Sequence, residues 1–174
     1  MSPPPEPAHS PPDWVADTVF YQIFPDRFAR AADAPELPHL EPWEAPPTRH
    51  GFKGGDLRGI AERLDYLSGL GVGAIYLTPI FASASNHRYH TYDYFRVDPL
   101  LGGDAAFDHL VAAAHDRGIR IILDGVFNHV GRPHPAFQDV MKNGKNSPYA
   151  DWFNVTSWDP FEYTGWAGFG DLPE

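Results

Sequence analysis

Three polar side chains stand close together after an apolar segment of the chain. Asp124 directly follows the apolar run Ile119–Leu123, and Asn128 and His129 lie within the next five residues. In α/β proteins, reactive side chains gather at the carboxyl ends of strands. These three groups could therefore bind a hydroxylated ligand or an ion. The alternative is an ordinary loop with an Asx-turn and a histidine that is hydrogen-bonded within the protein.

A second segment, residues 85–94, alternates aromatic rings with hydrogen-bonding side chains in the sequence SNHRYHTYDY. Such a surface suits sugars, because their C–H faces stack on rings while their hydroxyl groups need donors and acceptors. An edge strand is the alternative, since Tyr92 and Tyr94 alternate in strand fashion. His87 and His90 could also bind a metal. A metal site is the weaker interpretation, because the segment has neither an HxH nor an HExxH spacing.

Periodic segments elsewhere in the chain must position these side chains. Short apolar runs predict three strands, at Val19–Phe24, Ala74–Thr78 and Ile119–Leu123. Two further segments repeat apolar residues at spacings of three and four, which is typical of helices with one buried face. The first predicted helix begins at Asp56 and ends at Gly71, and the second runs from about Asp104 to Gly118.

The order of these elements is strand, helix, strand, helix, strand. Helical crossovers of this kind join neighbouring parallel strands with right-handed connections. The pattern excludes a β-sandwich and predicts either a doubly wound sheet or a (β/α) barrel. Gly54, Gly55 and Asp56 precede the first helix, but they form no GxGxxG fingerprint and lack the lysine of a phosphate-binding loop. Nucleotide binding is therefore not favoured.

Composition excludes several classes of partner. The chain has 174 residues, with 13 Lys and Arg against 23 Asp and Glu, so that its net charge is −10. This acidity argues against nucleic acid or an anionic membrane as the main partner. No cysteine is present, and no apolar run approaches the roughly 18 residues of a membrane span. The first twelve residues have no basic and apolar regions of a secretory signal, so a cytoplasmic protein is expected.

Six sequence blocks together are similar to the alpha-amylase superfamily of glycoside hydrolases. The block at 124–129, DGVFNH, strongly resembles the Asp-x-Val-x-Asn-His motif of that family. The other blocks follow in the family's order, and the last two resemble the cyclomaltodextrinase and neopullulanase branch in particular. These blocks are Tyr21–Phe28, Gly54–Leu57, Gly71–Pro79, Ser85–Tyr89 and Asp93–Tyr94.

The resemblance implies a (β/α)₈ TIM barrel with a small domain inserted after the third strand. This chain would supply the first three βα units and the start of the inserted domain. The implied divisions are a Pro-rich tail at 1–17, the first part of the catalytic barrel at 18–131, and the start of the inserted domain at 132–174. Within the second part, the Pro-rich stretch Ala31–Thr48 is predicted to be a long irregular loop, a kind of segment that is often functional.

The resemblance also implies roles for individual residues. Tyr89 would stack on the sugar at the cleavage subsite, and His87 and His129 would hydrogen-bond to the hydroxyl groups of that sugar. Asp124 would hold the shape of the site. Asn128 matches a position that binds structural calcium in many amylases, so calcium is the one ion expected, and no cofactor is required for the reaction.

Some residues depart from the pattern of that branch. His90 stands where the branch usually has Asp, and the loop after Arg27 lacks the branch's calcium-binding cluster of Asn and Asp. The nucleophilic Asp and the acid Glu of the family follow its fourth and fifth strands, beyond the three strands predicted here. The last residues, Leu172–Glu174, resemble the first half of a Leu-Pro-x-Leu-Asn block.

The sequence therefore predicts the N-terminal part of a retaining α-glycosidase that acts on maltodextrins, cyclodextrins or related α-glucans. This part alone is expected to be inactive, because retaining hydrolysis needs two carboxyl groups about 5–5.5 Å apart. One alternative is a non-catalytic carbohydrate-binding remnant. Another is a metal-dependent barrel hydrolase that uses His87, His129 and Asp124.

Overall fold

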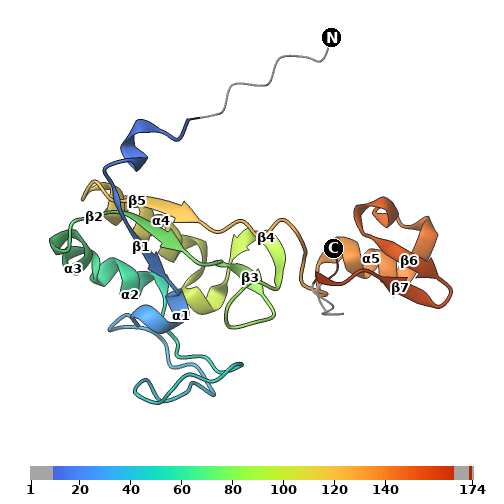
Figure 1. Ribbon diagram of the computed structural model, residues 1–174. Helices are drawn as coiled ribbons and strands as arrows, with labels where there is room; N and C mark the ends of the chain where they lie inside the picture. The colour runs from blue at the N-terminus through green and yellow to red at the C-terminus, as the bar shows by residue number, and fades with distance from the viewer. Residues whose placement is uncertain (1–9, 167–172, 174) are drawn as a thin grey trace, which may run out of the picture.

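A three-stranded parallel sheet forms the centre of the molecule (Figure 1). The computed structural model describes residues 10–166 and residue 173. Strand β2 (Val72–Leu77) lies between β1 (Val19–Ile23) and β5 (Arg120–Leu123), and both pairings are parallel. The register places Ile23 beside Leu77 and Leu77 beside Leu123, so the three strands end together. The predicted parallel arrangement of adjacent strands is thus confirmed.

The first crossover differs from its prediction in one respect. The segment predicted as one helix forms two, α2 (Leu57–Glu62) and α3 (Leu64–Gly69), which are separated at Arg63. Arg63 leaves the helical region, with φ −104° and ψ 5°. The apolar face nevertheless continues across the break, because its four leucine and isoleucine side chains are all fully buried: Leu57, Ile60, Leu64 and Leu67. Apolar periodicity reports this buried face and does not detect a local change of backbone angle.

Helix α2 begins as predicted at an aspartate cap. The Asp56 carboxylate accepts a hydrogen bond from the backbone N–H of Gly59 at 2.7 Å. Its second oxygen accepts one from the N–H of Ala31 at 3.2 Å, so the cap also holds the loop after β1. The second crossover helix, α4 (Gly103–His115), ends shortly before Gly118, whose φ of +68° is easily adopted by glycine.

The core lies between the sheet and these helices. Its central residues come from β2 and from the buried faces of α2, α3 and α4, and most of their side chains have no exposed surface. Burial of a leucine or isoleucine side chain stabilises the folded state by about 1.5–3 kcal/mol. Members of this core include Leu57, Ile60, Leu64, Leu67, Ile75, Leu77, Leu101 and Leu110.

A small antiparallel pair follows β2. Strand β3 (Phe81–Ser83) pairs with β4 (Thr91–Val97), and the 3₁₀ helix η2 (Pro99–Leu101) leads from there into α4. Tyr92 and Tyr94 lie on β4, so the edge-strand alternative is correct for the second half of segment 85–94. The first half, residues 85–90, is the loop that joins the two strands.

Short elements occupy the remaining segments. After β1 come α1 (Pro25–Phe28) and a long irregular loop, in which Leu40 and Phe52 form an isolated bridge. Within the predicted N-terminal tail lies one 3₁₀ helix, η1 (Asp13–Val15). Residues 1–9, most of the predicted tail, lie outside the described residues, as do Leu172 and Glu174.

A separate unit follows the central sheet and stands to one side of it in Figure 1. It comprises α5 (Pro135–Asn143), two 3₁₀ helices, η3 (Gly144–Asn146) and η4 (Ala150–Trp152), and an antiparallel pair formed by β6 (Val155–Trp158) and β7 (Phe161–Tyr163). The fully buried ring of Phe137 packs edge-on against Phe153 and Tyr163, at 5.0 and 4.8 Å between ring centroids.

Candidate functional site

Loops that follow the three parallel strands surround a cavity of about 660 Å³. One wall comes from the loop after β1, a second from the loop between β3 and β4, and a third from the segment after β5. The lining residues are rich in aromatic and imidazole rings, and they are Arg49, His50, Phe52, Ala84, Ser85, Asn86, His87, Tyr89, His90, His129 and Trp166. The site therefore lies at the carboxyl end of the sheet, as expected for an α/β fold.

Asp124 follows β5 directly and fixes two tyrosines. One carboxylate oxygen, Oδ2, accepts hydrogen bonds from the hydroxyl groups of Tyr76, at 2.6 Å, and of Tyr89, at 2.9 Å. The hydrogen bond to Asp124 raises the pKa of Tyr76 to about 12. Burial, together with the bond to Asp124, raises the pKa of Tyr89 to about 12. Both tyrosines are thus held as neutral donors, and the Tyr89 ring is fixed at the cavity wall.

His129 contributes a buried ring with one unused nitrogen. Its Nε2 lies 3.1 Å from the backbone oxygen of Tyr89, and the Trp166 ring stacks on the imidazole with centroids 5.0 Å apart. The side chain is 7% exposed, and its Nδ1 has no hydrogen-bond partner in the part of the chain that the structure describes. A buried polar atom of this kind is costly unless it is paired. Nδ1 is therefore a ring nitrogen that the described residues leave unpaired, although it is buried in this structure.

His87 lies two residues before Tyr89, and two hydrogen-bonding groups hold its ring. Its Nδ1 lies 3.2 Å from the Ser85 hydroxyl and accepts from the backbone N–H of Tyr89 at 3.2 Å. The ring of His90 stands edge-on to it at 4.8 Å. Burial is the main cause that lowers the pKa of His87 to about 4, and electrostatic interactions with His90 and Arg88 act in the same direction. The imidazole is therefore neutral at pH 7.

A buried ion pair fixes the turn that carries His87 and Tyr89. Arg88 lies between them with φ +61° and its side chain points into the protein, where its Nε donates to Asp98 at 2.7 Å. The exposed fractions of the two side chains are 2% and 7%. Arg88 also donates to the backbone oxygen of Asn86 at 2.7 Å. The neighbours of Arg88 consequently face the cavity.

The structure brings most of the predicted site residues together. Tyr89, His87 and His129 line the cavity. Asp124 is not among the lining residues, and it acts through Tyr89. Asn128 is exposed in the loop before His129, and calcium binding there stays a prediction. Among the described residues no group of three or more His, Cys, Asp or Glu side chains could hold a metal ion.

Some residues of the site were not predicted from the sequence. Tyr76 was assigned only to a buried strand, and Arg49, His50 and Phe52 lie in or beside a segment predicted as irregular loop. The only available signal was that long loops in compact domains are often functional. The lining residues include no Asp or Glu. The cavity can stack on a ligand and hydrogen-bond to it, but its described lining residues supply no carboxyl group for acid catalysis or nucleophilic attack.

A family comparison assigns the chain to a known group of enzymes. The model of the alpha-amylase catalytic domain matches residues 22–167 of the chain. The chain belongs to this family. The prediction of an alpha-amylase-type glycoside hydrolase domain is thereby confirmed.

Individual relatives carry names from one part of the alpha-amylase family. A cyclomaltodextrinase from a Bacillus species is 51% identical over 148 residues, which cover 84% of this chain and 26% of that protein. The intracellular maltogenic amylase of Bacillus subtilis strain 168 is 48% identical over 166 residues, with 94% of this chain and 28% of that protein covered. The chain thus spans about a quarter of the length of these curated relatives.

Solved structures give the same fold. The cyclic alpha-maltosyl-(1→6)-maltose hydrolase of Arthrobacter globiformis, in complex with cyclic alpha-maltosyl-(1→6)-maltose, matches with a TM-score of 0.85 and 47% identity, over 93% of this chain and 38% of that chain. A crystal structure of a protein from Thermus thermophilus matches with a TM-score of 0.84 and 56% identity, over 92% of this chain and 36% of that chain. The predicted fold class, part of a TIM barrel, is confirmed.

No helix in the described part of the chain is both long and apolar enough to cross a membrane.

Proposed function

We propose that the protein to which this chain contributes hydrolyses α-glucosidic bonds of maltodextrins, cyclodextrins or related α-glucans. The observation that carries the proposal is the cavity at the carboxyl end of the sheet. Rings line it, and the buried Nδ1 of His129 faces no partner among the described residues. The relatives named cyclomaltodextrinase and maltogenic amylase support glucans as the ligand class.

Each residue of the cavity has a role in this proposal. Tyr89 stacks on one glucosyl unit. Asp124 holds the ring in position by accepting a hydrogen bond from its hydroxyl group. His87 and His129 hydrogen-bond to hydroxyl groups of that unit, for which they have neutral or unpaired nitrogens. Hydrogen bonds that strengthen as the transition state forms raise kcat.

The reaction needs two carboxyl groups, and the described residues that line this cavity supply none. In retaining hydrolysis one carboxylate attacks the anomeric carbon while a carboxylic acid protonates the leaving oxygen. Asp124 cannot do both, and its Oδ2 already accepts two tyrosine hydroxyl groups. The carboxyl pair is therefore proposed to come from sequence outside this chain. The chain by itself would bind the glucan and would not cleave it.

Two further expectations belong to the proposal. Calcium at Asn128 would be structural, and no step of the reaction depends on it. A cytoplasmic location is proposed on the name of the Bacillus subtilis relative, an intracellular maltogenic amylase. An α-glucan oligosaccharide is the proposed partner, without a role for nucleic acid or a membrane.

The test is to express the longest protein that the gene encodes beside the chain 1–174. Release of reducing sugar would be measured on β-cyclodextrin, maltoheptaose and pullulan. Hydrolysis by the longer protein and none by 1–174 is the expected result. No hydrolysis of any glucan by the longer protein, together with binding of maltoheptaose, would favour the non-catalytic carbohydrate-binding alternative.

A further inference from the structure

A buried lysine holds the loop that forms one wall of the cavity. The Lys53 side chain is 5% exposed, and its Nζ donates to the backbone oxygens of Pro42, at 2.7 Å, and Ala45, at 2.6 Å. A carboxylate oxygen of Glu41 lies 3.6 Å from the same nitrogen. A buried ammonium group is costly unless it is paired and hydrogen-bonded. Lys53 meets this requirement only while the turn at 41–45 stays in place.

The backbone beside Lys53 is fixed to the end of β1. The buried carboxylate of Asp26 accepts hydrogen bonds from the N–H groups of Lys53, at 3.0 Å, and Gly54, at 3.1 Å. Asp26 lies in α1, directly after the first strand of the sheet. Lys53 therefore connects a rigid part of the fold to an irregular loop.

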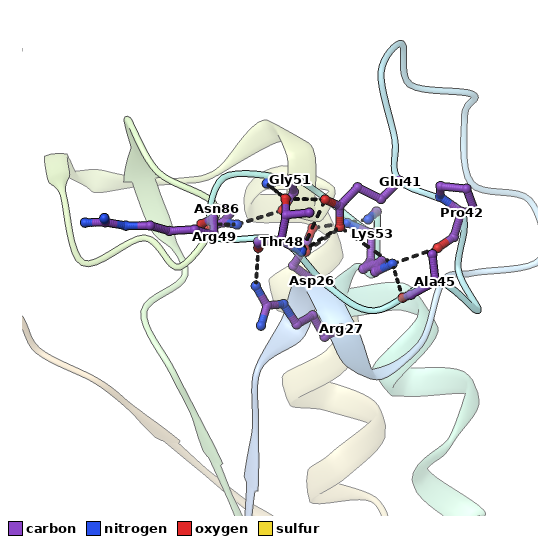
Figure 2. Close-up of polar contacts among 11 residues, drawn as sticks. Asp26, Arg27, Glu41, Pro42, Ala45, Thr48, Arg49, Gly51, Lys53 and Asn86 are labelled. Carbon is purple, nitrogen blue, oxygen red and sulfur yellow. Dashed lines mark hydrogen bonds and ion pairs between the residues drawn. The ribbon is translucent and has the colours of Figure 1, made fainter.

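The same network continues from Glu41 to the cavity (Figure 2). The Glu41 carboxylate accepts from the backbone N–H and the hydroxyl group of Thr48, and the Thr48 hydroxyl accepts from Gly51 N–H at 3.1 Å. From the other side, the buried Asn86 side chain donates to the backbone oxygens of Arg49, at 3.2 Å, and Gly51, at 2.6 Å. The backbone of 48–51 is thus held at both of its sides.

The side chains carried by this fixed backbone face a ligand. Arg49 and His50 are exposed and line the cavity together with His87 and Tyr89. In Figure 2 the Arg49 side chain extends away from Lys53 and Glu41, beyond Asn86. A guanidinium and an imidazole group offer several hydrogen-bond donors to sugar hydroxyl groups. The cavity, at about 660 Å³, is large enough for more than one glucosyl unit.

We infer that Arg49 and His50 determine glucan length preference by contacting a second glucosyl unit, adjacent to the one at Tyr89, and that Lys53 is their positioning residue. This inference rests on the proposed function. A maltotriose molecule with one unit at Tyr89 can place its other two units on the side away from Arg49 and His50, whereas maltoheptaose has enough units to occupy both sides. Loss of these contacts should therefore weaken the use of long glucans only.

The test uses the longest protein that the gene encodes and measures kcat and KM on maltoheptaose and maltotriose. The exposed double variant Arg49→Ala/His50→Ala should raise KM for maltoheptaose about tenfold with kcat unchanged, because it removes binding shared by ground state and transition state. Its KM for maltotriose should change less than twofold. Lys53→Met should likewise raise KM for maltoheptaose more than KM for maltotriose, and it should make amide hydrogen exchange at 48–52 faster. The control variants are Lys145→Met and Arg63→Ala, at exposed positions away from the cavity.

Each outcome decides between the inferences. A wild-type protein that neither binds nor hydrolyses a glucan overturns the proposed function and this inference with it. A wild-type protein that is active, with equal KM values for the double variant and wild type on maltoheptaose, overturns the second subsite alone. An equal rise in KM for maltoheptaose and maltotriose in the double variant also overturns the second subsite, because it indicates general damage to the site. If Lys53→Met does not fold, Glu41→Gln tests the positioning role, and an unchanged KM on maltoheptaose contradicts that role.

Discussion

At the scale of single residues, the site depends on one carboxylate that is shared by two phenols. Charge-assisted O–H···O⁻ hydrogen bonds are shorter and about twice as strong as neutral ones. Asp124 makes two of them, at 2.6 and 2.9 Å, and they join β2, β5 and the loop at Tyr89. This geometry explains how a side chain that does not line the cavity still determines the position of one that does.

Asp124→Asn should lower the pKa of both Tyr76 and Tyr89 from about 12, since the negative acceptor is lost. Tyrosinate absorbance, followed from pH 9 to 12, would report the change against the exposed control Asp108→Asn. More tyrosine should ionise below pH 11 in Asp124→Asn than in the control, chiefly from Tyr76, because the bond to Asp124 is the main cause of its raised pKa whereas burial is the main cause for Tyr89. Identical titration curves would contradict the shared-carboxylate geometry.

His87 predicts a specific loss of stability in acid. Its pKa is lowered from 6.5 to about 4 in the folded protein, so the unfolded chain binds more protons between these two pH values. Stability contributed by this group is complete above pH 6.5 and is lost as the pH falls toward 4. His87→Gln lacks this titration, so the difference in unfolding free energy between wild type and variant should shrink from pH 7 to pH 4. Urea unfolding at several pH values measures it, and a constant difference would contradict the pKa shift.

At the scale of elements, the loop between β3 and β4 is held by its interior rather than by regular structure. Arg88 and Asp98 form an ion pair that is almost fully buried. Removal of one partner from such a pair leaves an uncompensated charge and costs about 3–5 kcal/mol. An exposed pair contributes less than about 1 kcal/mol. The position of His87 and Tyr89 therefore depends on a contact that lies outside the cavity.

Arg88→Met should destabilise the protein by about 3–5 kcal/mol. The matched control is Arg58→Met, which removes the exposed pair with Asp33 and should cost less than about 1 kcal/mol. Chemical denaturation of both variants gives the comparison. Equal costs for the two would show that the Arg88 pair does not hold the loop.

Sequence patterns predicted the elements better than the contacts between them. The strands, the Asp56 cap and the gathering of Tyr89, His87 and His129 followed from apolar periodicity and from family motifs. The position of Tyr76 beside Asp124 could not be predicted, because it depends on the register that pairs Tyr76 with Ile122. The contacts of Lys53 were missed for a similar reason, since the backbone oxygens that its Nζ contacts, those of Pro42 and Ala45, lie in a loop without periodicity.

At the scale of the whole molecule, the described sheet has two open edges. Strands β1 and β5 each pair only with β2 among the described residues. Val19 and Phe20 on β1 are 55% and 44% exposed, and Phe95 on β4 is 99% exposed. Unpaired strand edges and exposed apolar side chains favour association between chains. A closed barrel would cover such edges.

The chain 1–174 by itself should self-associate and show no glycosidase activity. The open edges cause the first effect, and the lack of Asp and Glu among the described lining residues causes the second. Sedimentation velocity across a concentration series, with a reducing-sugar assay on the same samples, tests both. A monomer that melts cooperatively would contradict the first expectation. Hydrolysis that Asp124→Ala abolishes would contradict the second.

The most direct measurement of the central claim is kcat on β-cyclodextrin for the longest protein that the gene encodes, with and without His129→Ala. If the buried imidazole hydrogen-bonds to the sugar at the point of cleavage, its loss should lower kcat about tenfold or more. The stability of the variant, measured in parallel, confirms that it is folded. An unchanged kcat in a folded His129→Ala protein would contradict the glucan site assigned to this cavity.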